Sequence, residues 1–369
     1  MAGILSIGWW VPPGRRSAQE IADDYGLALD AVVRLGLQSK TVPGDDDHPS
    51  TMGARATRHA LEAAGLTPDD LDLLIFAGVT RDWPAPWIAA FGVLHELGAH
   101  RAAGLDLANR CAGGIDALWL ARMLVESGTY RRVAVCCADR YDHVMSPRHR
   151  MVELVNDVAY AAGAATAIVS AEADNDIVAF SHLTNPDLSA HTAGGPVAGG
   201  TRRPVDEAAV QDRLHLWRSR LSIGKSEMIA RYSADADRHN YRRLFAQTGW
   251  NGVDFVACSP VIPGPQLAVL KEIGIDARAT AFTIPGTIPH LGHIGPADLL
   301  LILGVATAVG RKVGPRVAMS VRTPVYANAL ALAARGNDLA IRTAGDGLDL
   351  GLWASPPDRA RTREDVHEK

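Results

Sequence analysis

The sequence is poor in cysteine, and its few cysteines form no known metal-binding or disulfide pattern. The 369 residues include only Cys111, Cys136, Cys137 and Cys258, and none of these stands in a CxxC pair. Four irregularly spaced thiols are too few for a disulfide framework, which indicates a reducing compartment. We therefore expect a cytoplasmic protein that holds no metal ion.

An excess of charge, a long hydrophobic run and a secretion signal are also missing. The formal net charge is −4, so bulk electrostatics give no reason to expect nucleic-acid binding. The apolar run at residues 299–310 is too short to cross a bilayer. The opening residues MAGILSIGWWVPP lack the charged start and long apolar core of a signal peptide. We expect neither a nucleic-acid partner nor a membrane partner.

The sequence does contain a regular alternation of strand-like and helix-like runs. The continuous apolar runs are typical of strands buried on both faces. Ser17 and Glu20 have the spacing of a capping box, which predicts that a helix begins there. In the first half this reading predicts strands at 3–10, 70–80, 131–139 and 163–170, and helices at 17–27 and 51–66. The pattern predicts an α/β fold with central strands.

The second half repeats the pattern of the first. It predicts a helix, turn and strand within 244–260, a helix at 264–275, a long apolar helix within 290–310 and a strand at 316–323. Each half carries a polar turn that opens a buried helix, at Cys111 in the first and at His293 in the second. Two similar halves would bring these helix starts toward one centre.

The organisation that follows is two halves with one insertion and a tail. We assign the halves to residues 1–172 and 173–354. The region at about 184–240, rich in Gly, Arg and His, looks like an inserted loop and helix. The polar residues 355–369 are expected to form a disordered tail.

Cys111 lies at the start of an apolar helix, in the stretch LDLANRCAGGIDALWLARMLVESG at 105–128. The free N–H groups and positive dipole end of a helix favour a thiolate at that place. Gly113 and Gly114 leave room for an acyl group beside the sulfur. Two interpretations stay open from these residues alone: a nucleophile, or an inert buried cysteine.

His293 lies in a glycine-flanked turn before the second apolar helix, and Asp298 follows in the first turn of that helix. An imidazole there can deprotonate a thiol or an attacking alcohol or amine. A nearby carboxylate can fix its tautomer and stabilise the imidazolium. The alternative is that Asp298 only caps the helix and His293 is a loop residue.

Several of these segments resemble the thiolase superfamily, and specifically β-ketoacyl-ACP synthase III. The resemblance lies in the strand before VPP, LGLQSKTV, LDLLIFAGVT, LANRCAGGIDALWLARMLVESG and AYAAGAATAIVS, and it extends to about residue 333. It implies a thiolase-like fold of two pseudo-duplicated halves in five αβαβα layers, and a homodimer. It also implies that Cys111, in the family's active-site cysteine segment, is the nucleophile.

Three positions depart from the pattern of that family. Ser259 stands where the family has the histidine of a His-Gln-Ala-Asn motif, and His293 stands at its asparagine. The glycine-rich turn that helps to build the family's oxyanion hole reads RTPVYANALAL here. Asn328 or the Cys111 N–H would then supply the missing donors.

These departures change the expected reaction. Decarboxylative condensation passes through an enolate that the family's paired donors stabilise, and losing one such donor costs about 100- to 1000-fold in rate. Transfer to oxygen or nitrogen needs no enolate. The pattern resembles the ketosynthase-III-like acyltransferases of antibiotic and polyketide pathways, which move an acyl group from CoA or a carrier protein to a sugar, an aminocyclitol or another carrier. A C–C bond-forming enzyme and a non-catalytic partner subunit are the two alternatives.

The remaining candidates concern substrate binding. His191, in the inserted region, is a candidate for proton transfer from the acceptor. Trp83 and Trp87 fall where the resemblance places the acyl pocket and the dimer interface. Arg34, Arg148 and Arg150 are candidates for contact with the phosphates of CoA or with an acidic acyl carrier protein. No permanently bound cofactor is expected.

Overall fold

The computed structural model describes residues 1–26, 28–33, 37–82, 87–141, 154–155, 158–185, 223–259, 263–276, 290–322 and 326–351. Two sheets organise this part of the chain. The first has the order β14-β1-β9-β6-β4-β5 and the second the order β10-β13-β12-β11. The strands of the first sheet are β1 (Gly3–Trp10), β4 (Leu73–Phe76), β5 (Ala103–Asp106), β6 (Arg132–Arg140), β9 (Ala162–Ser170) and β14 (Arg342–Asp346). Those of the second are β10 (Asn175–Thr184), β11 (Phe255–Cys258), β12 (Arg316–Arg322) and β13 (Tyr326–Ala334).

Four neighbouring strands of the first sheet, β1-β9-β6-β4, repeat the order and the directions of the four strands of the second sheet. In the first, β1 is antiparallel to β9, β9 is antiparallel to β6, and β6 is parallel to β4. In the second, β10 is antiparallel to β13, β13 is antiparallel to β12, and β12 is parallel to β11. This repeated topology is the internal likeness that the predicted alternation of elements indicated.

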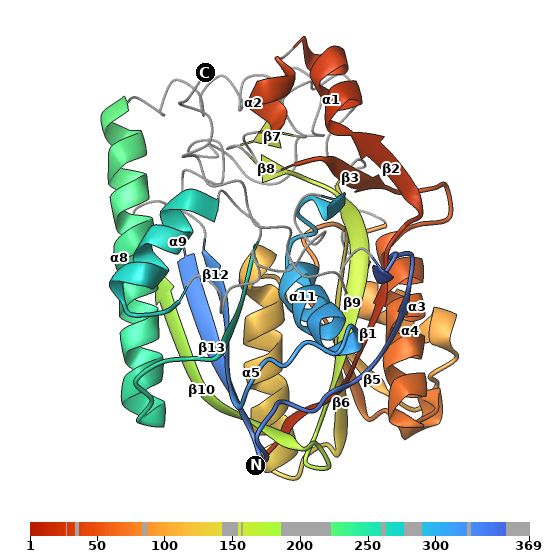
Figure 1. The fold of residues 1–369 in the computed structure, drawn as a ribbon. Helices are drawn as coiled ribbons and strands as arrows, with labels where there is room; N and C mark the ends of the chain where they lie inside the picture. Colours follow the sequence, from red (N-terminus) through yellow and green to blue (C-terminus); the bar gives the residue numbers. More distant parts are fainter. Residues whose placement is uncertain are drawn as a thin grey trace, which may run out of the picture.

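The helices separate and cover the sheets. They are α1 (Ala18–Tyr25), α2 (Leu29–Val33), α3 (Pro49–Ala64), α4 (Ala89–Leu97), α5 (Gly113–Glu126), α8 (Ile223–Thr248), α9 (Pro263–Glu272) and α11 (Ala297–Ala308). α3 and α4 pack on the outer face of the first sheet, α5 and α11 lie between the sheets, and α8 packs on the second sheet (Figure 1). These five αβαβα layers confirm the predicted fold class.

Short elements complete the frame. They are two antiparallel two-stranded sheets, β2 (Gly14–Ser17) with β3 (Ser39–Val42) and β7 (Leu154–Val155) with β8 (Val158–Ala159), and the 3₁₀ turns Pro68–Asp70 and Arg110–Ala112. The predicted capping box is present, because Ser17 caps α1 and the Glu20 side chain accepts from the Ser17 N–H. The strand predicted over 70–80 is shorter in the structure, where β4 covers Leu73–Phe76.

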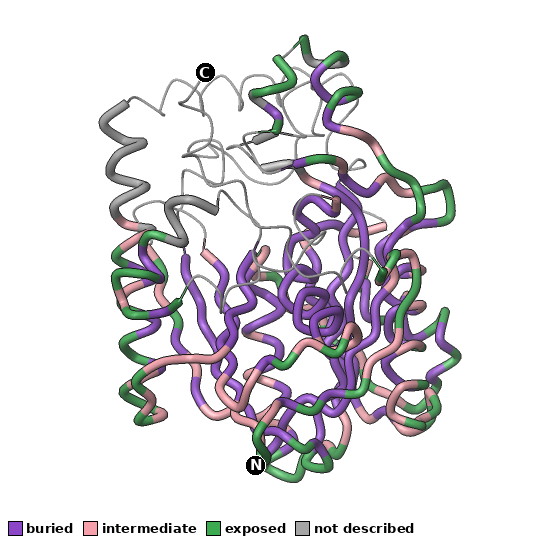
Figure 2. Tube along the Cα trace, in the orientation of Figure 1, coloured by how far each residue is buried: buried purple, intermediate pink, exposed green. Residues whose placement is uncertain are grey.

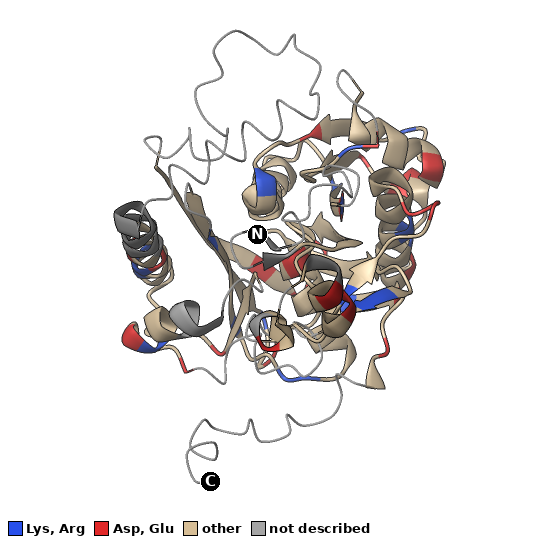
Figure 3. Cartoon of the chain, turned by 90° about the horizontal axis from the view of Figure 1, so that it is seen from above, with Lys and Arg blue, Asp and Glu red and all other residues tan. Residues whose placement is uncertain are grey.

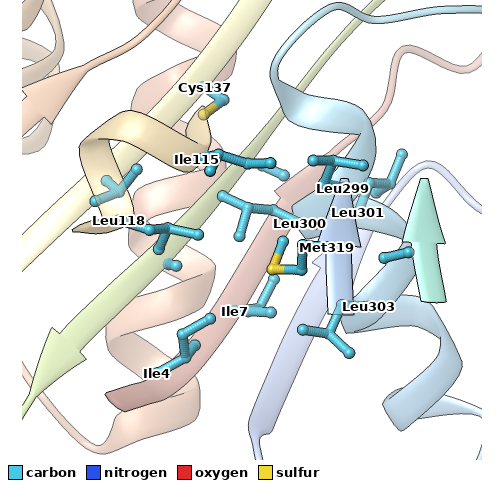
Figure 4. Close-up of a cluster of buried hydrophobic side chains, with 14 of the residues drawn as sticks. Ile4, Ile7, Ile115, Leu118, Cys137, Leu299, Leu300, Leu301, Leu303 and Met319 are labelled. Atoms are coloured by element: carbon cyan, nitrogen blue, oxygen red, sulfur yellow. The ribbon is translucent and has the colours of Figure 1, made fainter. Parts of the chain in front are cut away.

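The largest part of the core lies between the sheets, where α5 meets α11. Residues Ala297–Ala306 of α11 are buried on every side, as a helix enclosed by two sheets requires. Figure 4 shows Ile115 and Leu118 of α5 together with Leu299 and Leu300 of α11 in this cluster. Burying one such side chain stabilises the fold by about 1.5–3 kcal/mol. Figure 2 shows the buried centre and the exposed outer helices.

Figure 3 shows that basic and acidic residues are interspersed along the described part of the chain. No helix within the described ranges is long and apolar enough to cross a membrane. The helix expected in the inserted region is seen from residue 223 onward as α8, which continues to Thr248. The two-half boundary and the insertion remain our assignment, and the expected tail at 355–369 lies outside the described residues.

Candidate active site

Cys111 lies in the 3₁₀ turn Arg110–Ala112, immediately before the first residue of α5. It is half-buried, and its neighbour Arg110 has a φ of 48°, the one positive φ of a non-glycine residue in the part of the chain that is described. A Cβ at Gly114 would lie 2.9 Å from the Pro296 carbonyl oxygen. The small residue therefore lets the start of α5 come close to the start of α11.

His293 is presented by the loop before α11. Its carbonyl oxygen accepts a hydrogen bond from the Ala161 N–H at 3.0 Å, which ties the loop to the start of β9. Gly295 turns the chain with a φ of 68°. His293 and Asp298 are only 4% and 3% exposed. The side chains of His293 and Asp298, both predicted to lie in or beside this turn, are thus held inside the protein, between the two sheets.

A continuous chain of contacts joins the two helix starts. Cys111 Sγ lies 3.3 Å from His293 Nε2, and His293 Nδ1 lies 2.5 Å from Asp298 Oδ2. The other oxygen of Asp298 accepts from the Ile294 N–H at 2.8 Å. Asp298 thus orients the ring as the expected base-holding carboxylate does, while also fixing the loop backbone.

The electrostatics favour a charged imidazole. Burial by itself lowers the pKa of His293, but the charges of Asp298 and Cys111, and the hydrogen bonds to both, raise that pKa well above its usual value. A protonated ring beside the sulfur stabilises a thiolate. The arrangement can therefore accept a proton from Cys111, or from an acceptor that later takes its place, and return it.

Three tyrosines that sequence reasoning missed surround the Cys111–His293 pair. The ring centroids of Tyr160 and Tyr141 lie 5.3 Å and 6.5 Å from that of His293. Tyr326 is 5% exposed and interacts with Cys111 at the side chain and at the backbone. Burial, together with the charge of Cys111, raises the pKa of Tyr326, so its hydroxyl keeps its proton. Their place in the sequence could have indicated two of them. Tyr160 lies in AYAAGAATAIVS and Tyr326 in RTPVYANALAL, two segments that were compared above with the ketosynthase pattern.

Three of the other candidates from the sequence lie within the described residues, and five do not. Ser259 follows β11 and is 3% exposed. Asn328, in β13, donates from Nδ2 to Asp116 of α5, so this amide group is already engaged. Trp87 is half-buried against the cluster beneath α3 and α4. The candidates that lie outside the described residues are His191, Trp83, Arg34, Arg148 and Arg150.

The remaining cysteines behave as core residues. Cys136, Cys137 and Cys258 are fully buried, and burial raises the pKa of Cys136 to about 11. Within the described ranges, no group of three or more His, Cys, Asp or Glu side chains could hold a metal ion. Cys111 is thus the one partly accessible thiol among the four, and it is the one beside a histidine.

The chain is similar in sequence to ketoacyl synthases of known type. A family model described as 3-oxoacyl-[acyl-carrier-protein (ACP)] synthase III matches residues 105–186. Acetoacetyl CoA synthase NphT7 of Streptomyces sp. (strain CL190) is 33% identical over 317 residues, which cover 83% of this chain and 90% of that protein. The beta-ketoacyl-[acyl-carrier-protein] synthase III of Listeria innocua serovar 6a is 32% identical over 149 residues, or 39% of this chain. That match spans 46% of the Listeria enzyme's own length, about half.

Solved structures agree on the fold. The 3-oxoacyl-[acyl-carrier-protein] synthase III of Aquifex aeolicus VF5 superposes with a TM-score of 0.70 at 17% identity, covering 90% of this chain and 100% of that one. The acyltransferase ChlB3 gives a TM-score of 0.73, also at 17% identity, covering 91% and 98%. At such identity these structures show the fold alone. The near full-length relative from Streptomyces, together with the family model, establishes that the chain belongs to the 3-oxoacyl-ACP synthase III-like family of the thiolase superfamily.

Proposed function

We propose that the protein is an acyltransferase that moves an acyl group from a CoA or acyl-carrier-protein thioester, by way of Cys111, to a hydroxyl or amine. The observation that carries the proposal is the chain of contacts from Cys111 through His293 to Asp298. At the end of β11 the side chain is that of Ser259, where the family pattern has a histidine. The site thus has a thiol and an oriented base but lacks the family's paired enolate donors.

In the first step, His293 Nε2 holds the proton of Cys111, and the thiolate attacks the carbonyl carbon of the donor. The carbon–sulfur bond to CoA or the carrier then breaks, and the leaving thiolate takes the proton from Nε2. Asp298 stabilises the imidazolium throughout. The Cys111 N–H, in the 3₁₀ turn before α5, and the Tyr326 hydroxyl are the proposed oxyanion donors. Asn328 is left out because its amide is engaged with Asp116.

In the second step, the acceptor gives its O–H or N–H proton to His293 Nε2 and attacks the acyl carbon. The bond to Cys111 breaks and the thiolate is restored. This step requires one base and one oxyanion site, both present once the donor has left. It generates no carbanion, so Ser259 is not asked to stabilise an enolate. Secondary metabolism, including antibiotic pathways, is the proposed setting, and the cytoplasm the proposed location.

The test is intact mass spectrometry with acetyl-CoA and longer acyl thioesters. We expect one acyl group on the wild type and none on Cys111→Ala. Addition of amine or alcohol acceptors should then discharge the wild-type adduct. Failure of the wild type to acylate, or an undiminished adduct on Cys111→Ala, would contradict the proposal. Pathway product that persists in Cys111→Ala would instead support a non-catalytic partner subunit.

A condensing reaction is the second candidate, and the near full-length similarity to acetoacetyl CoA synthase NphT7 favours it. It would make a C–C bond at the acyl-Cys111 carbon, with His293 as one enolate donor and the Ser259 hydroxyl as the other. The discriminating substrate is malonyl-CoA or malonyl-ACP. Release of CO₂ with a β-ketoacyl product selects condensation, whereas transfer to a heteroatom without CO₂ selects the acyltransferase.

We also propose a homodimer formed along β5. That strand is the edge of the first sheet. Leu105 within it is 40% exposed, and Ile88 and Phe91 beside it are 38% and 54% exposed. An open strand edge flanked by apolar side chains favours pairing with a second copy. Light scattering should give twice the chain mass for the wild type and a monomer for Phe91→Asp. A monomeric wild type would contradict this proposal.

A further inference from the structure

We propose that Asp116 is a positioning residue for Cys111, whose carboxylate fixes the loop that carries the thiol and ties it to the second sheet. The inference rests on the nucleophilic role proposed above for Cys111. Asp116 lies in the first turn of α5. Its Oδ2 accepts from Asn109 Nδ2, and its Oδ1 accepts from Asn328 Nδ2. One carboxylate therefore joins the loop before the nucleophile to a strand of the other half.

The nucleophile loop needs such a support because its backbone is strained. Arg110, between Asn109 and Cys111, has a φ of 48° without being a glycine. A side chain with a Cβ in that region costs about 1–2 kcal/mol, and such a conformation persists only where its surroundings fix it. The bond from Asn109 to Asp116 anchors the residue next to the strained one.

The far end of the connection is rigid. Asn328 is fully buried in β13, where it lies opposite Val321 of β12 and His182 of β10. A strand paired on both sides cannot move without breaking its ladder. Through Asp116, the Cys111 loop is therefore anchored to the second sheet. The same sheet packs, at β11, against α11, the helix that follows the His293 loop.

The role is positional, because both carboxylate oxygens of Asp116 accept hydrogen bonds from side-chain amides, those of Asn109 and Asn328, rather than from the Cys111 thiol. Burial raises the pKa of Asp116, while hydrogen bonds from Asn109 and Asn328 and the nearby His182 lower it. The reacting contact between Cys111 Sγ and His293 Nε2 is 3.3 Å long. A displacement of about 1 Å at a reacting group costs on the order of 100-fold in rate.

The experiment exchanges the donor and the acceptor. Asn109→Asp alone places two carboxylates face to face, and we expect it to slow Cys111 acylation about 100-fold. Asp116→Asn alone should slow it about tenfold, because two amides face each other until one turns over. In the double variant Asn109→Asp/Asp116→Asn, the new amide at 116 donates to the new carboxylate at 109 and still accepts from Asn328. We expect acylation within about threefold of wild type.

The readouts are the single-turnover rate with acetyl-CoA and the rate of Cys111 alkylation by iodoacetamide, with thermal unfolding alongside. Alkylation reports Cys111 because the other three cysteines are buried. Glu126→Gln is the matched control, since Glu126 is a hydrogen-bonded carboxylate at the opposite end of α5. It should leave both rates unchanged.

Two results overturn the inference: wild-type rates in Asn109→Asp, or a folded double variant that stays as slow as Asn109→Asp. Should Asn109→Asp fail to fold, Asn109→Ala removes the donor without adding charge, and a rate within twofold of wild type there also overturns it. A wild type that reacts with iodoacetamide but never with acyl thioesters contradicts the proposed function alone. The alkylation series still decides the role of Asp116 in that case.

Discussion

The loops that open α5 and α11 share one design but differ in how an aspartate supports them. Each places a reactive side chain before a buried central helix and an acidic residue in the first turn of that helix. Asp298 contacts the reactive side chain itself, at His293 Nδ1. Asp116 instead contacts Asn109, two residues before Cys111.

The difference follows from what each reactive group requires. An imidazole has two distinct nitrogens, so a base needs its tautomer and ring orientation set by direct contact. A thiolate has no such orientation and needs only its location fixed. The backbones of the two loops differ as well. The base loop has its positive φ at a glycine, Gly295, whereas the nucleophile loop has it at Arg110, which carries a side chain. Substitutions at His293 and Asp298 should therefore act mainly on proton transfer. Substitutions at Asp116 should act mainly on the position of the Cys111 sulfur.

The largest effect is expected at the base. His293→Ala removes the proton acceptor 3.3 Å from Cys111 Sγ. We expect single-turnover acylation to fall by about 10⁴-fold, the upper range for a general base. Stopped-flow release of CoA thiol measures it. A fall of less than tenfold would show that Cys111 is activated without His293.

The second largest effect is expected for Asp298→Asn, which should slow single-turnover acylation by between about 10³- and 10⁴-fold. The Asn oxygen can still accept from the Ile294 N–H, but its NH₂ group faces His293 Nδ1. Nδ1 must then act as acceptor, which puts the ring proton on Nε2, toward the sulfur. The same substitution at Asp116 leaves the ring untouched and should cost about tenfold. Single-turnover rates of both variants test this, and equal losses would remove the distinction between the two supports.

The sequence predicted the parts of this site that depend on helix starts. Cys111, His293 and Asp298 are candidates from the sequence because polar turns before apolar helices are visible as local patterns, and the family resemblance then favours Cys111 as the nucleophile. The repeated topology brings the two turns together. The capping box at Ser17 was predictable for the same local reason.

Contacts between distant positions were not predictable in this way. Asp116 and Asn328 are 212 residues apart, and their contact depends on strand register and on side-chain rotamers. Asn328 was therefore interpreted as an oxyanion donor when its amide is turned to Asp116. The Tyr326 hydroxyl was missed because nothing in its local sequence shows which way it points. The strand β14 was missed as well, since RTAGD carries no apolar pattern.

Gly295→Ala probes the backbone on the base side. The φ of 68° disfavours any Cβ, and a Cβ there would lie 2.5 Å from Tyr141 Oη and 2.7 Å from Asp139 Oδ2. We expect the free energy of unfolding to fall by about 3 kcal/mol, since a contact penalty adds to the 1–2 kcal/mol of left-handed backbone. Gly65→Ala is the control, because Gly65 has a φ of 71° with nothing within 4 Å of its Cβ position. Urea unfolding of both variants measures the difference, and equal losses would mean that the contacts behind the base loop are unimportant.

Asp139→Asn gives the smallest expected effect and concerns the carboxyl group behind Gly295. Burial raises the pKa of Asp139 to about 7, despite hydrogen bonds to Oδ1 from the Thr80 and Val79 N–H groups and the Thr80 hydroxyl. An unfolded aspartate has a pKa of about 4, so the folded protein binds the extra proton between these values. Its stability is therefore lost as the pH rises through that window.

The Asn side chain keeps the Oδ1 acceptor and does not ionise, so the variant should lose less stability on going from pH 5 to pH 8, by about 2 kcal/mol. Asp237, whose pKa burial raises to about 6, contributes the same slope to both proteins and cancels in the difference. Urea unfolding at the two pH values supplies the comparison. Parallel pH profiles would show that Asp139 is ionised in the folded protein, and the base loop would then have a charged rather than a neutral carboxyl group behind it.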